Sequence, residues 1–196
     1  MSTLASDTFD RADSTSIGAD WTEQSGSWAI ASNKLSQSSS GTSHATWDTA
    51  LSASPAADYS VTVTVRLTTT GGAGLTVRWQ DDSNSYRTVV NTVSQYLRLN
   101  KRVAGTNTTL GQYNGGQSID TDYTIKCSVV GSDFEVFQDG TSRITASDSD
   151  ITAAGKPSLT SDSAGKLYDN FLVEGTLATS TVVKDLIMAG MIPFAR

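Results

Sequence analysis

The stretch Tyr59-Ser60-Val61-Thr62-Val63-Thr64-Val65-Arg66-Leu67 alternates apolar and polar side chains along its length. Every second residue from Val61 to Leu67 is apolar, and the residues between them are Thr or Arg. In a β-strand, successive side chains point to opposite faces of the sheet. The stretch is therefore predicted to be a β-strand with one buried face and one polar face.

The same alternation recurs along the rest of the chain, at residues 75–79, 96–100, 123–129 and 134–137. Helical periodicity is almost absent from this part of the sequence. Many short antiparallel strands without helices are typical of β-sandwiches and β-barrels.

Turn-forming residues separate these stretches at short intervals. They are Gly71-Gly72-Ala73-Gly74, Asp81-Asp82-Ser83-Asn84, Asn114-Gly115-Gly116 and Asp139-Gly140. An Asp-Gly pair tolerates the positive φ angles of a type I′ turn, so residues 138–141 are predicted to form a tight hairpin. The glycine-rich residues 71–74 are also interpreted as a hairpin turn, and not as a phosphate-binding loop.

Composition fits one ordinary domain with a tail. The chain has 196 residues, a formal net charge of -6 and a pI of about 4.6. An acidic balance does not attract phosphate backbones, so we expect no binding to nucleic acid. Charged residues make up only 17% of the chain, which predicts a surface hydrated largely by hydroxyl groups, as in many extracellular and virion β proteins.

Cys127 is the only cysteine, so no disulfide can form within the chain. The alternation of residues 123–129 places it on the apolar face, which predicts a buried and unreactive thiol. No stretch is long and apolar enough to span a membrane. Residues 1–6 lack the basic and apolar parts of a secretory signal, so we expect synthesis in the cytosol and release within an assembly or by lysis.

Four segments at the two ends of the main body resemble one known superfamily. They are Asp7-Thr8-Phe9-Asp10-Arg11-Ala12-Asp13, Gly18-Ala19-Asp20-Trp21, Gly26-Ser27-Trp28-Ala29-Ile30 and Leu167-Tyr168-Asp169-Asn170-Phe171-Leu172-Val173-Glu174-Gly175. Together they resemble the concanavalin A-like lectin/glucanase superfamily, in particular its laminin-G-like and bacterial or phage jelly-roll members. The resemblance implies that the first and last strands lie side by side and close the sandwich. The expected fold is all-β: an antiparallel jelly-roll β-sandwich over residues 1–175, followed by a linker and a short apolar tail at residues 176–196.

The resemblance also implies a structural calcium ion where the first and last strands meet. Asp7 and Asp169 are the positions that it offers, and carboxylate oxygens are ligands that calcium prefers. The alternative is that Asp169 and Asn170 only cap or turn the last strand.

The glutamates of this chain argue against an enzyme. Glucanases with this fold carry two glutamates on one strand as nucleophile and general acid. Here the only glutamates, Glu23, Glu135 and Glu174, lie far apart in the sequence. We therefore expect no catalytic residues.

Other candidate catalytic groups are equally weak. The aspartate pairs Asp120/Asp122 and Asp148/Asp150 lie in loop-like sequence and are interpreted as solvated turn carboxylates. His44 is the only histidine, and nothing suggests a Ser-His-Asp arrangement or a histidine-rich metal site.

A ligand-binding face is predicted from the polar side of the alternating strands. Arg78, Arg87, Tyr96 and Arg98 fall opposite the apolar side chains, so a sugar could stack on the tyrosine while the arginines donate to hydroxyls or carboxylates. The alternative is that these side chains only decorate a solvated sheet face.

The tail contains a strongly apolar segment, residues 182–194, whose only charges are Lys184 and Asp185. Exposing such a segment is unfavourable by about 25 cal/mol per Å² of apolar surface. We therefore expect it to dock on its own sandwich, on a second copy or on another protein, with intermolecular docking favoured. The predicted docking residues are Val183, Leu186, Ile187, Met188, Met191, Ile192 and Phe194.

Two functions are consistent with these features. The first is a non-catalytic phage virion protein, a capsid decoration or tail-associated subunit that docks through its tail to other virion proteins or to copies of itself, and that also binds cell-surface glycan. The second is a free or secreted, extracellular carbohydrate-binding module. The sequence favours the first, because it explains the apolar tail together with the missing signal and disulfide.

Overall fold

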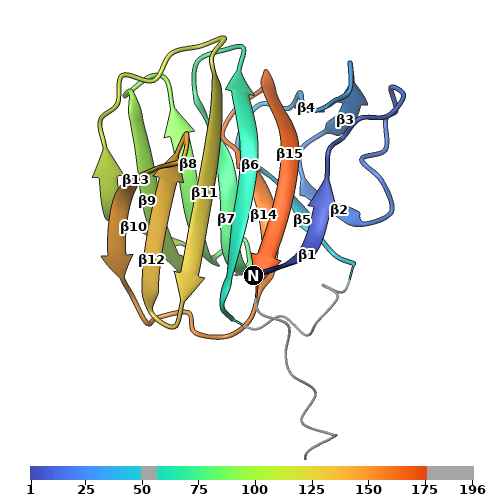
Figure 1. Ribbon diagram of the computed structural model, residues 1–196. Helices are drawn as coiled ribbons and strands as arrows, with labels where there is room; N and C mark the ends of the chain where they lie inside the picture. Colours follow the sequence, from blue (N-terminus) through green and yellow to red (C-terminus); the bar gives the residue numbers. More distant parts are fainter. Residues whose placement is uncertain (50–56, 176–196) are drawn as a thin grey trace, which may run out of the picture.

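The computed structural model describes residues 1–49 and 57–175, and this part of the chain consists of strands and loops (Figure 1). Among these residues no helix is long and apolar enough to cross a membrane. The expected all-β fold is confirmed.

The strands of the described residues form two antiparallel sheets, which lie as two layers in Figure 1. One sheet has eight strands. Seven of them follow the order β13 (Thr141–Ser147), β12 (Asp133–Gln138), β11 (Asp122–Val130), β6 (Tyr59–Leu67), β15 (Lys166–Gly175), β4 (Lys34–Gln37) and β3 (Trp28–Ala31), and β1 (Ser2–Asp7) also pairs with β15. The other sheet has seven strands, in the order β10 (Thr106–Tyr113), β9 (Tyr96–Val103), β8 (Asn84–Asn91), β7 (Gly72–Asp81), β14 (Lys156–Ser161), β5 (Ser43–Trp47) and β2 (Trp21–Ser25).

The first and last strands lie side by side, as the resemblance implied. β1 runs antiparallel to β15, from the pair Ser2 and Gly175 to the pair Asp7 and Phe171. β15 also pairs with β6, so the two ends of the sandwich sequence meet in the middle of the eight-stranded sheet (Figure 1).

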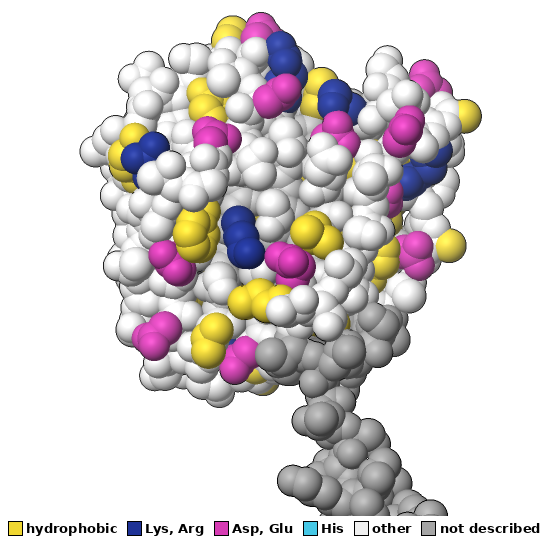
Figure 2. Space-filling view, in the orientation of Figure 1, with side chains coloured by type: hydrophobic (Ala, Val, Ile, Leu, Met, Phe, Trp, Pro, Cys, Tyr) yellow, Lys and Arg dark blue, Asp and Glu magenta, His cyan; other side chains and the backbone are white. Residues whose placement is uncertain are grey.

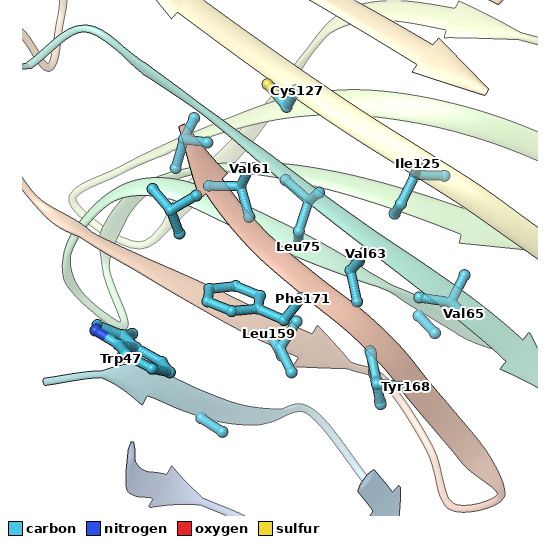
Figure 3. Close-up of a cluster of buried hydrophobic side chains, with 14 of the residues drawn as sticks. Trp47, Val61, Val63, Val65, Leu75, Ile125, Cys127, Leu159, Tyr168 and Phe171 are labelled. Atoms are coloured by element: carbon cyan, nitrogen blue, oxygen red, sulfur yellow. The ribbon is translucent and has the colours of Figure 1, made fainter. Parts of the chain in front are cut away.

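The core lies between the two sheets and is built by the alternation seen in the sequence. Val61, Val63 and Val65 of β6 have no exposed surface, and they face Leu75 and Leu159 of the opposite sheet (Figure 3). Complete burial of one such aliphatic side chain stabilises the fold by about 1.5–3 kcal/mol.

Two predicted turns had different outcomes. Asp139 and Gly140 have φ angles of 51° and 75° and join β12 to β13, which confirms the type I′ hairpin. The predicted hairpin at residues 71–74 is wrong, because Gly72 and Gly74 lie inside β7 and the connection from β6 crosses to the other sheet. A Cβ at Gly74 would lie 1.9 Å from the carbonyl oxygen of Thr88, so the close approach of β8 explains this glycine.

The outer face of the eight-stranded sheet has dispersed charges. Figure 2 shows acidic and basic side chains scattered over this face among uncharged ones. Lys126 pairs with Glu174 and Arg66 pairs with Asp122 there. This face therefore offers no single concentration of charge, and the opposite face carries the groove described next.

Candidate functional site

The outer face of the seven-stranded sheet carries a groove made of two adjoining clefts, of about 410 and 290 Å³. Thr42, Arg87 and Asn107 line both clefts, so the two are continuous. The larger cleft is also lined by Gly72, Val89, Tyr96, Arg98, Asn100, Thr109, Thr160, Ser161 and Asp162. The smaller cleft is also lined by Ser25, His44, Asp82 and Arg102.

Strand alternation aims the groove residues away from the core. In β9, Leu97 and Leu99 are completely buried in the core, whereas Tyr96, Arg98 and Asn100 line the groove. β8 follows the same rule. The polar face predicted from the sequence is thus a real surface of the sheet, and Arg87, Tyr96 and Arg98 meet on it.

Tyr96 and Arg98 form a stacked pair in the larger cleft. The guanidinium carbon of Arg98 lies 3.8 Å from the centre of the Tyr96 ring, and Nε of Arg98 donates to Oε1 of Gln112 at 2.8 Å. Two planar groups are therefore held together and half-buried at the cleft wall.

Arg87 and Arg102 converge between the two clefts. Nη2 of Arg87 and Nε of Arg102 both donate to the carbonyl oxygen of Asp82, at 2.9 and 2.7 Å. Nε of Arg87 also donates to Oγ of Ser85. Burial lowers the pKa of Arg87 to about 10, with Arg102 adding to the shift and Asp82 opposing it, so the Arg87 guanidinium stays charged at neutral pH.

His44 lines the smaller cleft together with these arginines and is 2% exposed. No described side chain hydrogen-bonds its ring, and the backbone of Leu159 is the one group that does, so at least one ring nitrogen has no partner among the described residues. Burial, with added repulsion from Arg87 and Arg102, lowers the pKa of His44 to about 3, although a hydrogen bond to the backbone of Leu159 opposes the shift. The imidazole is therefore neutral at pH 7, with one nitrogen as donor and one as acceptor.

Gly72 keeps the larger cleft open beside β14. Its N–H donates to Oδ1 of Asp162 at 2.5 Å. A Cβ at this position would lie 2.8 Å from Oδ2 of Asp162 and from Cγ1 of Val89. Any larger residue would therefore push against the cleft lining.

Arg78, expected on the ligand-binding face, is instead buried. It is 1% exposed, and its guanidinium donates to the carbonyl oxygens of Ala57, Ile151 and Gly131. Its φ angle is 50°, and the pairing of β7 shifts register between Val77 and the end of the strand. This left-handed bend breaks the alternation from which the outward position was inferred.

Asp7 and Asp169, the expected calcium ligands, each bind a basic side chain. Asp7 pairs with Arg11 at 2.7 Å and also accepts the indole N–H of Trp21, and Asp169 pairs with Lys34. Among the described residues no group of three or more His, Cys, Asp or Glu could hold a metal ion. Calcium binding stays a prediction, and an ion at these carboxylates would compete with Arg11 and Lys34.

No glutamate lines the groove. Glu23, Glu135 and Glu174 lie on three different strands, and the acidic side chains of the two clefts are Asp82 and Asp162. Asp162 lines the larger cleft and Asp82 lines the smaller one, so the two carboxylates do not face each other across a single cleft.

The aspartate pairs predicted as solvated turns have specific partners. Asp148 and Asp150 both bind Nζ of Lys101, at 2.5 and 2.6 Å. Asp122 lies in β11 and pairs with Arg66. The interpretation as solvated loop carboxylates holds for Asp150, which lies in a loop and is exposed. It is wrong for Asp148, whose side chain is largely buried, and Asp122 is exposed but lies in a strand.

The sequence analysis missed most of the groove lining, including Arg102, His44 and Thr160. Arg102 continues the every-second-residue pattern of β9, so extending the predicted strand past residue 100 would have found it. His44 and Thr160 come from β5 and β14, and these strands join the groove only through the sheet order, in which β14 pairs with β7 and β5 pairs with β14. The predicted docking residues of the tail lie outside the described residues, as does the linker before them.

Several solved structures share this fold. The carbohydrate-binding module CBM66 from Bacillus subtilis matches with a TM-score of 0.72 and 22% sequence identity, over 80% of this chain and 96% of the module. The GH43 protein BlXynB from Bacillus licheniformis matches with a TM-score of 0.61 and 15% identity, over 87% of this chain but only 39% of that protein. The galectin LEC-6 from Caenorhabditis elegans matches with a TM-score of 0.50 and 10% identity, over 60% of this chain and 83% of the galectin.

These likenesses show the fold alone, an antiparallel β-sandwich of two sheets. No protein-family model matches the chain, and no curated protein matches its sequence. These three structures are named as a carbohydrate-binding module, a GH43 protein and a galectin, and none of them supports the virion expectation.

Proposed function

We propose that this chain is a non-catalytic carbohydrate-binding module that holds a glycan in the groove on the seven-stranded sheet. The observation that carries the proposal is the lining of that groove. One surface combines the stacked Tyr96 and Arg98 with hydroxyl and amide groups from Asn100, Asn107 and Thr160. Sugars present flat C–H faces and many hydroxyls, so they need planar surfaces together with polar partners.

Two further observations support a binding role. The similar structure named as a carbohydrate-binding module is covered over 96% of its length, so a complete module of this fold can serve that purpose. None of the three glutamates faces the groove, which leaves it without the carboxylate pair of a retaining glucanase.

A glycan array with the full chain tests this function. The parent protein is expected to bind at least one class of glycan, and titration calorimetry then gives the affinity. Tyr96→Ala should weaken binding by about tenfold or more, because it removes the ring that Arg98 rests on and the surface that both present to the sugar.

Lys126→Ala is the matched control, since Lys126 lies on the outer face of the eight-stranded sheet. It should leave the affinity unchanged. Absence of binding to any glycan would sink the proposal, and so would an affinity that Tyr96→Ala leaves intact in a folded protein.

We keep the virion location and the docking of the tail as separate proposals. Both rest on the apolar sequence of residues 182–194. Deleting residues 182–196 should reduce self-association or assembly onto a particle without changing glycan affinity. Normal assembly of the shortened protein would exclude docking through the tail.

A further inference from the structure

Three arginines of the groove have no acidic partner among the described residues. Arg87, Arg98 and Arg102 are absent from every ion pair in that part of the chain, although the protein carries a net charge of -6. Their partners are neutral oxygens of a serine hydroxyl, a backbone carbonyl and a glutamine amide. The groove thus carries three arginines against two aspartates, Asp82 and Asp162, in a chain that is acidic overall.

Two of these guanidinium groups lie close enough to oppose each other's charge. Arg87 and Arg102 share the carbonyl oxygen of Asp82 and line the same cleft. Each guanidinium has five N–H groups, and no described residue accepts a hydrogen bond from Nη1 of Arg87 or from either Nη of Arg102. Several donors therefore remain for a bound anion.

His44 completes the cleft. It lines the smaller cleft with Arg87 and Arg102, it is 2% exposed, and beyond the backbone of Leu159 its ring has no hydrogen-bond partner among the described residues. A buried polar group without a partner is uncommon in folded proteins and marks a place that a ligand can fill.

We propose that the end of the groove formed by Arg87, Arg102 and His44 binds the carboxylate of a uronic acid within the glycan. This inference rests on the proposed function and specifies its substrate class. A planar carboxylate accepts paired hydrogen bonds from a guanidinium, and an anion between the two arginines relieves their mutual repulsion. The neutral part of the glycan then continues along the larger cleft past Tyr96 and Arg98.

The two acidic residues of the groove do not neutralise the positive charges of Arg87 and Arg102 at the end formed by the smaller cleft. Asp162 lies in the larger cleft and is engaged by the N–H of Gly72. Asp82 lines the smaller cleft with an exposed side chain, and it is its carbonyl oxygen that holds the two arginines. Neither carboxylate forms an ion pair with Arg87 or Arg102 among the described residues.

The test compares acidic oligosaccharides with neutral copies of themselves. Oligogalacturonate and oligoglucuronate are titrated into the full chain beside the same oligosaccharides after carboxyl reduction. The acidic form of at least one is expected to bind about tenfold more tightly than its reduced form. Arg102→Gln should bring the ratio of the two affinities close to one, and added salt should lower it for the parent protein.

Arg66→Gln is the control, because it removes one positive charge from the opposite sheet. Arg66→Gln should keep the parent's ratio of affinities for the acidic and the carboxyl-reduced oligosaccharide. Thermal melting verifies that both variants are folded. Equal affinities for the acidic and reduced forms would overturn the inference, as would binding of sulfated but not of carboxylated oligosaccharides. If neutral glycans still bind in a Tyr96-dependent way, only this inference fails; if no glycan binds, the proposed function fails.

Discussion

The hydroxyl of Tyr59 accepts the backbone N–H of Arg78 at 2.6 Å and joins β6 to β7 across the core. The same hydroxyl donates to the carbonyl oxygen of Gly155 at 3.0 Å. Arg78 has a φ angle of 50°, a conformation that few residues other than glycine adopt. Tyr59 therefore holds the bend that turns the Arg78 side chain away from the groove and into the end of the sandwich.

Arg78→Met is expected to lower the free energy of unfolding by about 2–4 kcal/mol, since three carbonyl oxygens lose their donor and Asp58 loses its ion-pair partner. Urea unfolding followed by tryptophan fluorescence measures it. Arg98→Met is the control, because Arg98 is half-buried and has one side-chain partner. Equal losses in the two variants would contradict the structural role of Arg78.

Most of the fold could be predicted from the sequence, because the alternation of apolar and polar side chains within a single strand shows which face of that strand is buried. Period-two alternation in residues 59–67 and 123–129 reports which face is buried, and both segments form strands whose apolar side faces the core. Glycines 72 and 74 were misassigned because a glycine in a strand and a glycine in a turn look alike in sequence. What distinguishes Gly74 is the backbone of β8 beside it, which depends on tertiary pairing.

The groove was only partly predictable for the same reason. Arg87, Tyr96 and Arg98 were found because they lie on regular strands, where alternation fixes their direction. Arg78 was placed wrongly because a left-handed residue interrupts that rule. His44 could not be found, since its place beside Arg87 follows from the sheet order and not from its own neighbours in sequence.

Lys166 supplies a second stability test. Its buried ammonium group donates to Oγ1 and the carbonyl oxygen of Thr69 and to the carbonyl oxygens of Thr70 and Ala164, at 2.9–3.2 Å. Burial lowers the pKa of Lys166, and Asp162 opposes the shift. Lys166→Met should cost about 2–4 kcal/mol of unfolding free energy, because it leaves carbonyls of two loops without a donor.

Lys126→Met provides the comparison for Lys166, since Lys126 is partly exposed and forms a surface pair with Glu174. Its loss should cost less than about 1 kcal/mol. Chemical denaturation of both variants measures the difference. A Lys166 variant as stable as the Lys126 variant would show that the loop carbonyls find other donors.

Cys127 is expected to be unreactive in the folded protein. It has no exposed surface and lies within the core cluster on β11 (Figure 3), and burial raises the pKa of its thiol to about 12. A thiol that stays protonated and shielded does not attack disulfide reagents. Titration with a chromogenic disulfide at pH 8 should give no signal until denaturant is added, and then one thiol per chain. Rapid labelling of the native protein would show that the two sheets separate readily at this point.

The pH dependence of stability isolates His44, the only histidine of the chain. Its pKa is lowered by burial to about 3, whereas an unfolded chain protonates it near 6.5. The folded state therefore loses stability as pH falls below 6.5, by about 1.4 kcal/mol for each pH unit until the folded pKa is reached. His44→Gln removes this contribution, so between pH 7.5 and pH 5 the parent should lose about 2 kcal/mol more unfolding free energy than the variant. Urea unfolding of both proteins at several pH values measures the difference. Parallel curves would mean that His44 takes up its proton in the folded state, with the cleft between Arg87 and Arg102 open to water.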